Sequence, residues 1–361
     1  MKRKIVIAAV ALCAAHCSWL TANAQTEVAP YLPGLTTEGI VYFLPKTAVR
    51  VTVQVEKTSY TPGDFAPYAE RYLRLSDVNM EPSTSYRIVS ITQSAFGVRD
   101  SEKAYAIRLN KKTSAVNVAQ AEDGVLLAVN AEANPREEYV PFKSAPKPAI
   151  VNPRQYMNEE ILAAGSKAKM AQLTAQEIYD IRDSRSQLIK GQADFMPKDG
   201  EQMKMMLSQM DQQDKALTSL FSGVTVRDTT EQVFVVVPDS VLQHQPLFRF
   251  SRHFGLVEAD DVSGSPYYIS VKNITQLPPT DEAAAKKQKK AAEGLYYNVP
   301  GKLRSIIYNG IDEVSSEDFP AGQFGNVELL NAELFNKHYG TRLWLNPLTG
   351  DVDKLEAEQP K

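Results

Sequence analysis

The stretch EGIVYFLPKTAVRVTVQVE, residues 38–56, decides the class of fold that this chain adopts. In its second half valines alternate with polar residues, and these valines are Val49, Val51, Val53 and Val55. Alternation with a period of two predicts a β-strand that has one buried face and one face in water. Such a strand is typical of an antiparallel sheet.

Pro45 lies near the middle of this stretch. Proline lacks the N–H group that a β-ladder needs, so Pro45 predicts a break between two strands, Ile40–Leu44 and Ala48–Val55. A related text, EGLYYNVPGKLRSIIY, returns at residues 293–308. Two shorter matches follow in the same order in both halves: Phe96-Gly97 with Phe324-Gly325, and Leu109-Asn110 with Leu345-Asn346. Each match alone could arise by chance, but their shared order is equally well explained by an ancestral duplication.

The composition is that of an ordinary globular protein. The chain has 361 residues, of which 43% are hydrophobic and 23% are charged. It is therefore long enough for two or three domains that each bury a core. Its formal net charge of −3 gives no electrostatic reason to bind nucleic acid, and we expect no nucleic-acid partner.

Residues 1–24 have the pattern of a signal peptide. A basic start, Lys2–Lys4, precedes an apolar run, Ile5–Ala15, that is short for a membrane helix. The small residues of Ala22-Asn23-Ala24 then predict cleavage before Gln25. We therefore expect the mature chain to be exported, either to the periplasm or to the cell exterior. No later apolar run reaches the length of a membrane helix, so we expect no membrane span in the mature chain.

Both cysteines of the chain, Cys13 and Cys17, lie inside this N-terminal segment. The mature chain should therefore have no disulfide and no thiol chemistry. Acylation of either cysteine would instead make the protein a lipoprotein. Leu12 and His16 are poor residues to precede an acylated cysteine, so we favour the first interpretation.

The rest of the chain divides by its periodicity into three ranges. Residues 25–150 contain several short alternating segments, which predict an N-terminal β domain. Residues 151–222 change to helical spacing and predict a hairpin of two amphipathic helices. Residues 223–361 return to alternation and predict a C-terminal β domain. We therefore predict an α+β fold that is mainly antiparallel β, with two β-sandwich-like domains joined by the helical hairpin.

Local signals mark the limits of these ranges. A cluster of prolines between residues 135 and 153 predicts a linker or an extended crossing. A capping-box pattern at Thr174 predicts the start of the first helix, Gly191 predicts its end, and Asp199 predicts the cap of the second. One face of the second helix carries three methionines: Met203, Met206 and Met210. Such a stripe is either plain core, which is the commoner case, or an adaptable surface for a partner.

Several longer segments together resemble a known family. They are the opening stretch, the helical text IRDSRSQL, the block FRFSRHFGLVEADDVSG, and an ending that contains YYNVPGK, QFGNVE and NPLTG. Through these segments the chain resembles the secreted Bacteroidetes family catalogued as domain of unknown function 4831, over essentially the whole mature length. The resemblance implies a lineage and a location in the periplasm or outside the cell, but it implies no catalytic residues.

The mature sequence contains no recognised nucleophile motif, zinc-binding spacing or phosphate-binding glycine loop. Its histidines, His244, His253 and His338, are isolated, and each is best interpreted as a surface or structural residue. A glycosidase needs only two carboxylates, which are often distant in sequence, so the sequence does not exclude one. We assign no catalytic residue.

An oxygen-rich loop is the one candidate for a metal site. Glu258, Asp260 and Asp261 precede Ser263 in this loop, and such residues could supply two or three of the oxygen ligands of a calcium ion. The loop lacks the spacing of a known calcium motif, which favours a solvated turn between strands. Apart from this calcium candidate, we expect no cofactor.

Aromatic residues are the candidates for binding a glycan, because sugars commonly stack on flat rings. Trp344, Tyr267 and Tyr296 are the residues that we select, and Tyr268 and Tyr297 could extend the same platform. Tyrosines in strands are more often ordinary sheet residues, and this interpretation stays open.

We therefore expect an exported, non-enzymatic protein that binds a partner protein or a glycan at the cell envelope. The alternative is a carbohydrate-active hydrolase that uses a pair of carboxylates. The two hypotheses differ in geometry, because a hydrolase needs two acids that face each other across a cleft. A binding protein needs only an exposed aromatic or apolar surface.

Overall fold

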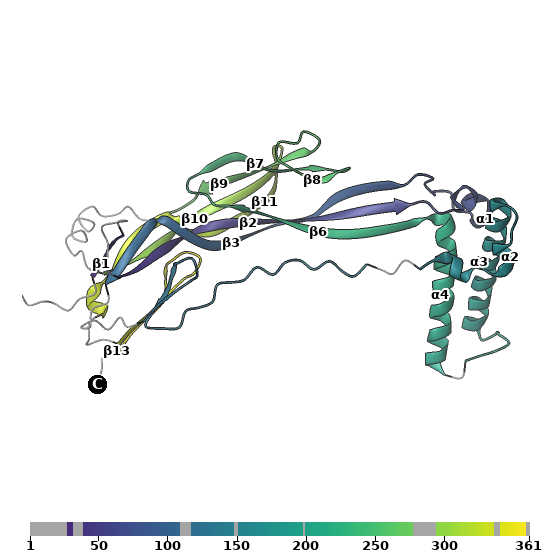
Figure 1. Ribbon diagram of the computed structural model, residues 1–361, viewed down its shortest axis with the longest axis horizontal. Helices are drawn as coiled ribbons and strands as arrows, with labels where there is room; N and C mark the ends of the chain where they lie inside the picture. The colour runs from purple at the N-terminus through teal and green to yellow at the C-terminus, as the bar shows by residue number, and fades with distance from the viewer. Residues whose placement is uncertain are drawn as a thin grey trace, which may run out of the picture.

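The computed structural model describes residues 27–31, 39–108, 117–147, 151–197, 199–276, 294–335 and 340–358. These residues form three antiparallel sheets and a group of helices, arranged as a long molecule with the helices at one end (Figure 1). The prediction of an α+β fold that is mainly antiparallel β is confirmed. The predicted signal peptide and His338 lie outside the described residues.

The first sheet is built around the stretch that opened the sequence analysis. Its strands, in the order β1-β3-β2-β6, are β1 (Glu27–Pro30), β3 (Ser83–Arg108), β2 (Ile40–Thr61) and β6 (Val224–Val236). The predicted alternation along β2 is confirmed, since Val49, Val51 and Val53 are fully buried and Arg50 and Thr52 between them are not. These valines therefore face a partner layer.

The partner layer is the second sheet. Its strands, in order, are β11 (Asp312–Asn331), β10 (Gly294–Asn309), β9 (Ser265–Asn273), β7 (Leu242–Ser251) and β8 (Gly255–Val257). Phe248, Ile269 and Leu303 on its inner face pack with the valines of β2 in one buried cluster. Each large apolar side chain buried in this way stabilises the fold by about 1.5–3 kcal/mol. The two sheets thus form a sandwich.

The third sheet closes the end of the sandwich opposite the helices (Figure 1). Its strands, in order, are β13 (Val352–Glu358), β12 (Gly340–Leu345), β5 (Leu126–Val129) and β4 (Val118–Gln120). Leu343 and Leu345 pack with Tyr42 and Leu126 in a second buried cluster, which a short helix, η3 (Ala332–Phe335), completes. A side chain on Gly97 of β3 would lie 2.1 Å from a backbone oxygen of the β12–β13 turn, so this close approach requires glycine.

Two of these sheets combine strands from both predicted β segments. The first sheet takes β6 from residues 223–361, and the third pairs β5 from residues 25–150 with β12. Sheet membership therefore does not follow the predicted ranges. Alternation identifies a strand and its buried face, but it does not say which distant strand lies beside it.

The helices form a head at the end of the long strands (Figure 1). They are η1 (Ala66–Tyr68), α1 (Ala69–Leu73), η2 (Pro153–Tyr156), α2 (Glu159–Leu162), α3 (Lys167–Lys190) and α4 (Gly200–Ser222). Phe65, Ile178, Leu217 and Phe221 are buried in a third cluster at the base of this head. None of the helices within the described ranges is long and apolar enough to cross a membrane.

Of the three residues that were predicted to mark the ends of α3 and α4, the structure confirms two. Gly191 ends α3 in a left-handed conformation with φ 70°, and Asp199 caps α4 by accepting a hydrogen bond from the Gln202 N–H at 2.7 Å. The predicted start at Thr174 is wrong, because α3 begins at Lys167 after the cap Ser166. The Thr174 hydroxyl instead donates to a backbone oxygen one turn earlier, which a threonine within a helix can do without ending it.

The proline-rich segment crosses from the third sheet towards the head as an extended chain (Figure 1). It is held by side chains rather than by a β-ladder. Lys147 lies 2.7 Å from Asp228 of β6, and the Tyr139 hydroxyl donates to Glu231. The Tyr139 ring also lies 4.5 Å from the Arg50 guanidinium. The prediction of an extended crossing is therefore correct for residues 131–147.

Each of the two longest hairpins is interrupted by a bulge. In β2 and β3, Leu44 alone faces residues 100–103. In β10 and β11, Pro300 alone faces residues 322–325. The two bulges therefore have the same size, with one residue opposite four. The predicted strand break at Pro45 is wrong, because the partner strand loops out opposite this position and β2 continues through it.

The shorter textual matches do not follow this equivalence. Gly97 pairs with Thr47 within the ladder, whereas Gly325 lies in a bulge. The match at Leu109-Asn110 lies outside the described residues. The ancestral duplication stays a prediction.

The two bulges interlock through buried polar groups. Asn298 is fully buried, and its amide N–H groups donate to the backbone oxygens of Pro45 and Thr349 at 2.9 and 2.7 Å. The Lys103 ammonium donates to Asn298 Oδ1 at 3.2 Å and to the Gly322 backbone oxygen at 3.0 Å. Burial lowers the pKa of this ammonium. Asn298 thereby joins β2, β3, β10 and the β12–β13 turn.

Gln323 makes the reciprocal contact from the bulge of β11 to the first sheet. Its amide oxygen accepts from the Thr47 N–H at 2.8 Å, and its amide N–H donates to the Thr47 backbone oxygen at 2.8 Å. A side-chain amide therefore takes the place of a strand on β2. We define the Asn298, Lys103, Gln323 and Thr47 contacts as the bulge junction.

We predict that Asn298→Ala lowers the free energy of unfolding by about 3 kcal/mol, because it removes the side-chain donors to two buried backbone oxygens and one of the two hydrogen bonds of the Lys103 ammonium. Urea unfolding followed by circular dichroism measures this loss. Asn326→Ala, at an exposed asparagine of β11, is the matched control and should change the stability by less than about 0.5 kcal/mol. Equal losses of unfolding free energy in the two variants would show that the Asn298 hydrogen bonds do not stabilise the fold.

Candidate functional site

The candidate site is the outer face of the second sheet, formed by β9, β10 and the start of β7. Along β9, Tyr267, Ile269 and Val271 point into the sandwich core. Tyr268 and Lys272 therefore point to the opposite face, because successive side chains of a strand alternate. The same alternation along β10 places Lys302, Arg304 and Tyr308 on this outer face, as the burial of Leu303 and Ile307 requires.

Three aromatic rings meet at one end of this face. Tyr308 and Tyr268 are directly opposite each other in the ladder between β10 and β9. The ring of His244, from β7, stacks on Tyr308 with a centroid distance of 4.9 Å and an interplanar angle of 20°. Its centroid lies 5.7 Å from that of Tyr268. We call these three residues the aromatic cluster. His244 is exposed, and Tyr268 and Tyr308 beside it are partly exposed.

His244 reaches the cluster through a strained backbone. The register of β7 and β9 shifts between Leu242 and Gln245, so a β-bulge places His244 over Ser270. The φ of His244 is 46°, in the left-handed region that residues other than glycine rarely adopt. The Ser270 hydroxyl accepts a hydrogen bond from the His244 N–H at 3.0 Å and holds this conformation. Strain of this kind is concentrated at functional positions.

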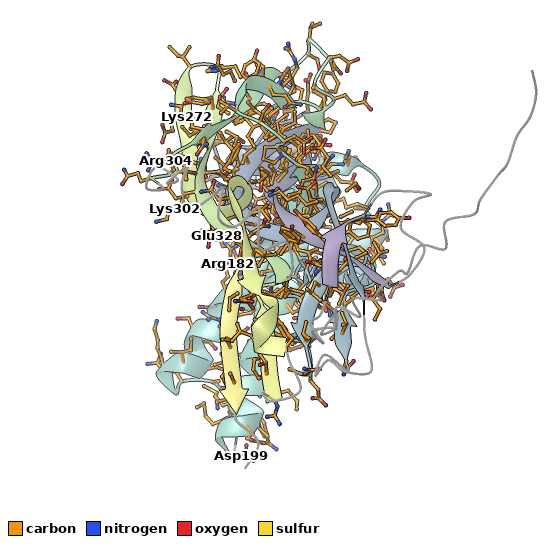
Figure 2. The ribbon with its side chains drawn as sticks, turned by 90° about the vertical axis from the view of Figure 1, so that its left-hand side faces the viewer. Arg182, Asp199, Lys272, Lys302, Arg304 and Glu328 are labelled. Carbon is orange, nitrogen blue, oxygen red and sulfur yellow. The ribbon has the colours of Figure 1, made fainter. Side chains whose placement is uncertain are left out.

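Cations lie at the other end of the same face. Arg304 is directly opposite Lys272 in the ladder, and Lys302 lies on the same side of β10. Figure 2 shows Lys272, Arg304 and Lys302 along one margin of the molecule, with their side chains directed away from the core. Lys302, Arg304 and Asp318 also line a surface cavity of about 630 Å³, together with Thr275 and Gln276. We call the three cations the basic end.

The charges of the basic end are not all available to a ligand. Arg304 donates two hydrogen bonds to Asp318, at 2.6 and 2.8 Å, and the guanidinium holds the pKa of the Asp318 carboxyl below its ordinary value. Lys272 and Lys302 make no ion pair with any residue that the structure describes. The two lysines therefore keep the positive charge of this end.

The whole face combines two kinds of recognition. Flat rings bind apolar faces of a ligand, and the ammonium groups bind an anionic group. Tyr308 and Arg304 are four residues apart on β10, which corresponds to about 13 Å along an extended strand. A ligand that reaches both ends must therefore be extended, and a small ion would occupy the basic end alone.

The structure places the three predicted binding residues apart from one another. Tyr267 is buried in the sandwich core and stacks on Phe248 at 4.6 Å. Tyr296 stacks on Tyr105 at 4.4 Å, and its backbone N–H donates to the Tyr42 hydroxyl. Both tyrosines thus have structural contacts.

Trp344 lies on the third sheet, away from both tyrosines. It faces opposite to the buried Leu343 and Leu345, as the alternation requires, and it is half-exposed. Its indole N–H donates to the Glu132 backbone oxygen at 3.0 Å, and the Lys354 ammonium lies 5.0 Å from the ring centroid. These contacts hold the proline-rich segment and β13 against the ring.

The predicted calcium loop is an exposed turn between β8 and β9. Asp261 accepts a hydrogen bond from the Ser263 N–H at 2.8 Å, which lowers the pKa of its carboxyl. Arg249 donates to the backbone oxygens of Ala259 and Gly264 at 2.9 and 3.1 Å. Glu258 and Asp260 are exposed. Within the described ranges, no three acidic, histidine or cysteine side chains lie close enough to hold a metal ion.

Two members of the aromatic cluster, Tyr308 and His244, were not predicted as binding residues from the sequence. The alternation of β10 was sufficient to place Tyr308 on the same face as Lys302 and Arg304. The partnership with His244 had no signal in the sequence, because it depends on the bulge in β7 and on the order of three strands. Of the residues that we considered for binding a glycan, Tyr268 alone belongs to the cluster, and His244 had been interpreted as a surface or structural residue.

Comparison with known proteins gives one match. A family model described as "Domain of unknown function (DUF4831)" matches residues 38–353. No curated protein and no solved structure matches the chain.

We predict that His244→Gly is more stable than His244→Ala by about 1 kcal/mol, because glycine adopts a positive φ without strain. Urea unfolding of the two variants measures the difference. At the neighbouring Gln245, whose φ is not positive, the order should reverse, with the glycine variant less stable than the alanine variant. The same order at both positions would show that His244 is not strained.

Proposed function

The chain belongs to the DUF4831 family, and because that description names no activity, we propose from the geometry that it is an exported protein that binds an acidic glycan. The aromatic cluster takes the apolar face of a sugar ring, and the lysines of the basic end take a carboxylate or sulfate on a neighbouring unit. The export rests on the signal-peptide pattern of residues 1–24. This pattern supports a location in the periplasm or outside the cell.

The single observation that carries the proposal is the presence of both features on one sheet face. His244 stacks on Tyr308 at one end, and Lys272 and Lys302 remain without an ion-pair partner at the other, within the described structure. The stacked rings and the two lysines lie on the same outer face of the second sheet. They suit a ligand that is flat in one part and anionic in another.

The shape of the site suits binding rather than turnover. The cavity at the basic end lies at the surface of the sheet. A glycosidase needs a general acid whose pKa is raised. Among the described carboxyl groups whose pKa departs from the ordinary value, each has a lowered pKa: Glu56, Glu231, Asp261, Asp318 and Glu356. No observation therefore favours the hydrolase alternative.

We predict that the mature chain binds polygalacturonate and does not bind the same polymer after methyl esterification, because esterification removes the anionic groups alone. Affinity electrophoresis in gels that contain each polymer measures the two dissociation constants. Binding should weaken as the ionic strength rises, since salt screens the contacts with the lysines. Equal retardation by both polymers, or by neither, would contradict the proposal.

Variants then separate the two ends of the face. Tyr308→Ala should weaken binding about tenfold through loss of the ring contact, and Lys272→Gln with Lys302→Gln should remove most of the salt dependence. Tyr179→Ala, at a tyrosine of α3 that is 47% exposed, is the matched control and should bind like the wild type. Circular dichroism confirms that each variant is folded.

A further inference from the structure

The helical head is well packed only at its base. The buried residues of α4 are Ala216, Leu217, Leu220 and Phe221, which all lie in its last two turns. Residues 200–215 of α4, about 24 Å of helix, contain no buried side chain. Figure 1 shows α3 and α4 extending side by side away from the ends of the long strands.

Large apolar side chains are exposed at this free end. They lie in the last turn of α3, in the loop, and in the first turns of α4, with exposed fractions of 56% for Ile189, 67% for Phe195, 42% for Met196 and 73% for Met205. We call these four residues the tip patch. Taking about 200 Å² for each large side chain, the patch exposes roughly 480 Å² of apolar surface. This is the size of the largest apolar patch on a typical monomer, and such a patch is often functional.

The predicted methionine stripe lies beside this patch. Met203, Met206 and Met210 are half-exposed, and Met210 alone packs against the core at the base of the head. The stripe is therefore not plain core along its whole length. Methionine adapts its shape to an opposing surface, so this part of α4 suits an interface.

The charges around the tip patch are of both signs. Lys190 and Lys204 are exposed there, and so are Asp194 and Glu201. None of the four takes part in an ion pair within the described structure. A strongly acidic or strongly basic partner would place like charges opposite two of these four residues. A second copy of the same tip, related by a two-fold axis, can place each lysine near an acid.

We propose that the tip patch binds the same patch of a second copy, so that two α3–α4 hairpins form a symmetric four-helix arrangement. A stable dimer buries about 800 Å² per partner, of which about 65% is apolar in the core of the interface. The tip patch and the half-exposed methionines supply that apolar core, and the mixed charges supply its rim. Two helical hairpins that pack in this way complete the bundle that one hairpin leaves half-covered.

Dimerisation at the tip joins the two molecules through their helical heads. Each outer face of the second sheet remains uncovered, because it lies away from the head (Figure 1). The dimer therefore presents two equivalent faces. This inference does not depend on what those faces bind.

We predict that the mature full-length chain sediments as a dimer in analytical ultracentrifugation, and that Phe195→Ser with Met205→Ser weakens the dimer at least tenfold. Phe254→Ser, at a phenylalanine of the β7–β8 turn that is 68% exposed, is the matched control and should leave the dimer intact. A wild-type monomer at about 100 μM, or a dimer that persists unchanged in the double variant, would overturn the proposal.

Charge exchange gives a second measurement that does not depend on losing apolar contacts. One variant carries Lys190→Glu and Lys204→Glu, and the other carries Asp194→Lys and Glu201→Lys. Each variant alone should be monomeric through repulsion, and their mixture should form a heterodimer. Two variants that dimerise alone as well as they do together would contradict the two-fold arrangement.

Discussion

The bulge junction is the contact on which the rest of the structure depends. The two long hairpins bury their apolar faces against each other. Their relative placement is fixed where buried Asn298 reaches the backbone of β2 and Gln323 pairs with Thr47. These contacts are made by polar groups, so they demand defined geometry as well as proximity. The apolar core of the sandwich supplies most of the stabilisation, and the junction supplies the register of one sheet on the other.

In that register the inner faces of the first and second sheets are buried against each other, and their outer faces differ. The first sheet has its outer face crossed by the proline-rich segment through Tyr139 and Lys147. The second sheet presents the aromatic cluster and the basic end, and a strained His244 completes the cluster at the cost of an unfavourable backbone conformation. With a positive φ, position 244 would favour glycine on backbone grounds alone. The contact with Tyr308 is the physical reason for a histidine.

The helical head has the opposite character. It is packed at its base by Phe65, Ile178 and Phe221 and incompletely packed at its tip, where Phe195 and Met205 are exposed. The long strands hold this head far from the outer face of the second sheet (Figure 1). The molecule thus carries an aromatic and basic surface on the second sheet and an apolar surface at the tip of α3 and α4. Separation along the strands allows both surfaces to be occupied at once.

The sequence by itself determined the mainly antiparallel α+β class, the buried face of β2, the extended crossing, and the ends of α3 and α4 at Gly191 and Asp199. These features depend on neighbours within a few residues, so periodicity and capping residues are sufficient to predict them. Only the tertiary structure decided that β6 joins the first sheet, that β3 loops out opposite Leu44, and that His244 meets Tyr308. Those contacts join residues far apart in the chain, and one strand pattern is compatible with many partners, because any strand with one apolar face can pair with any other.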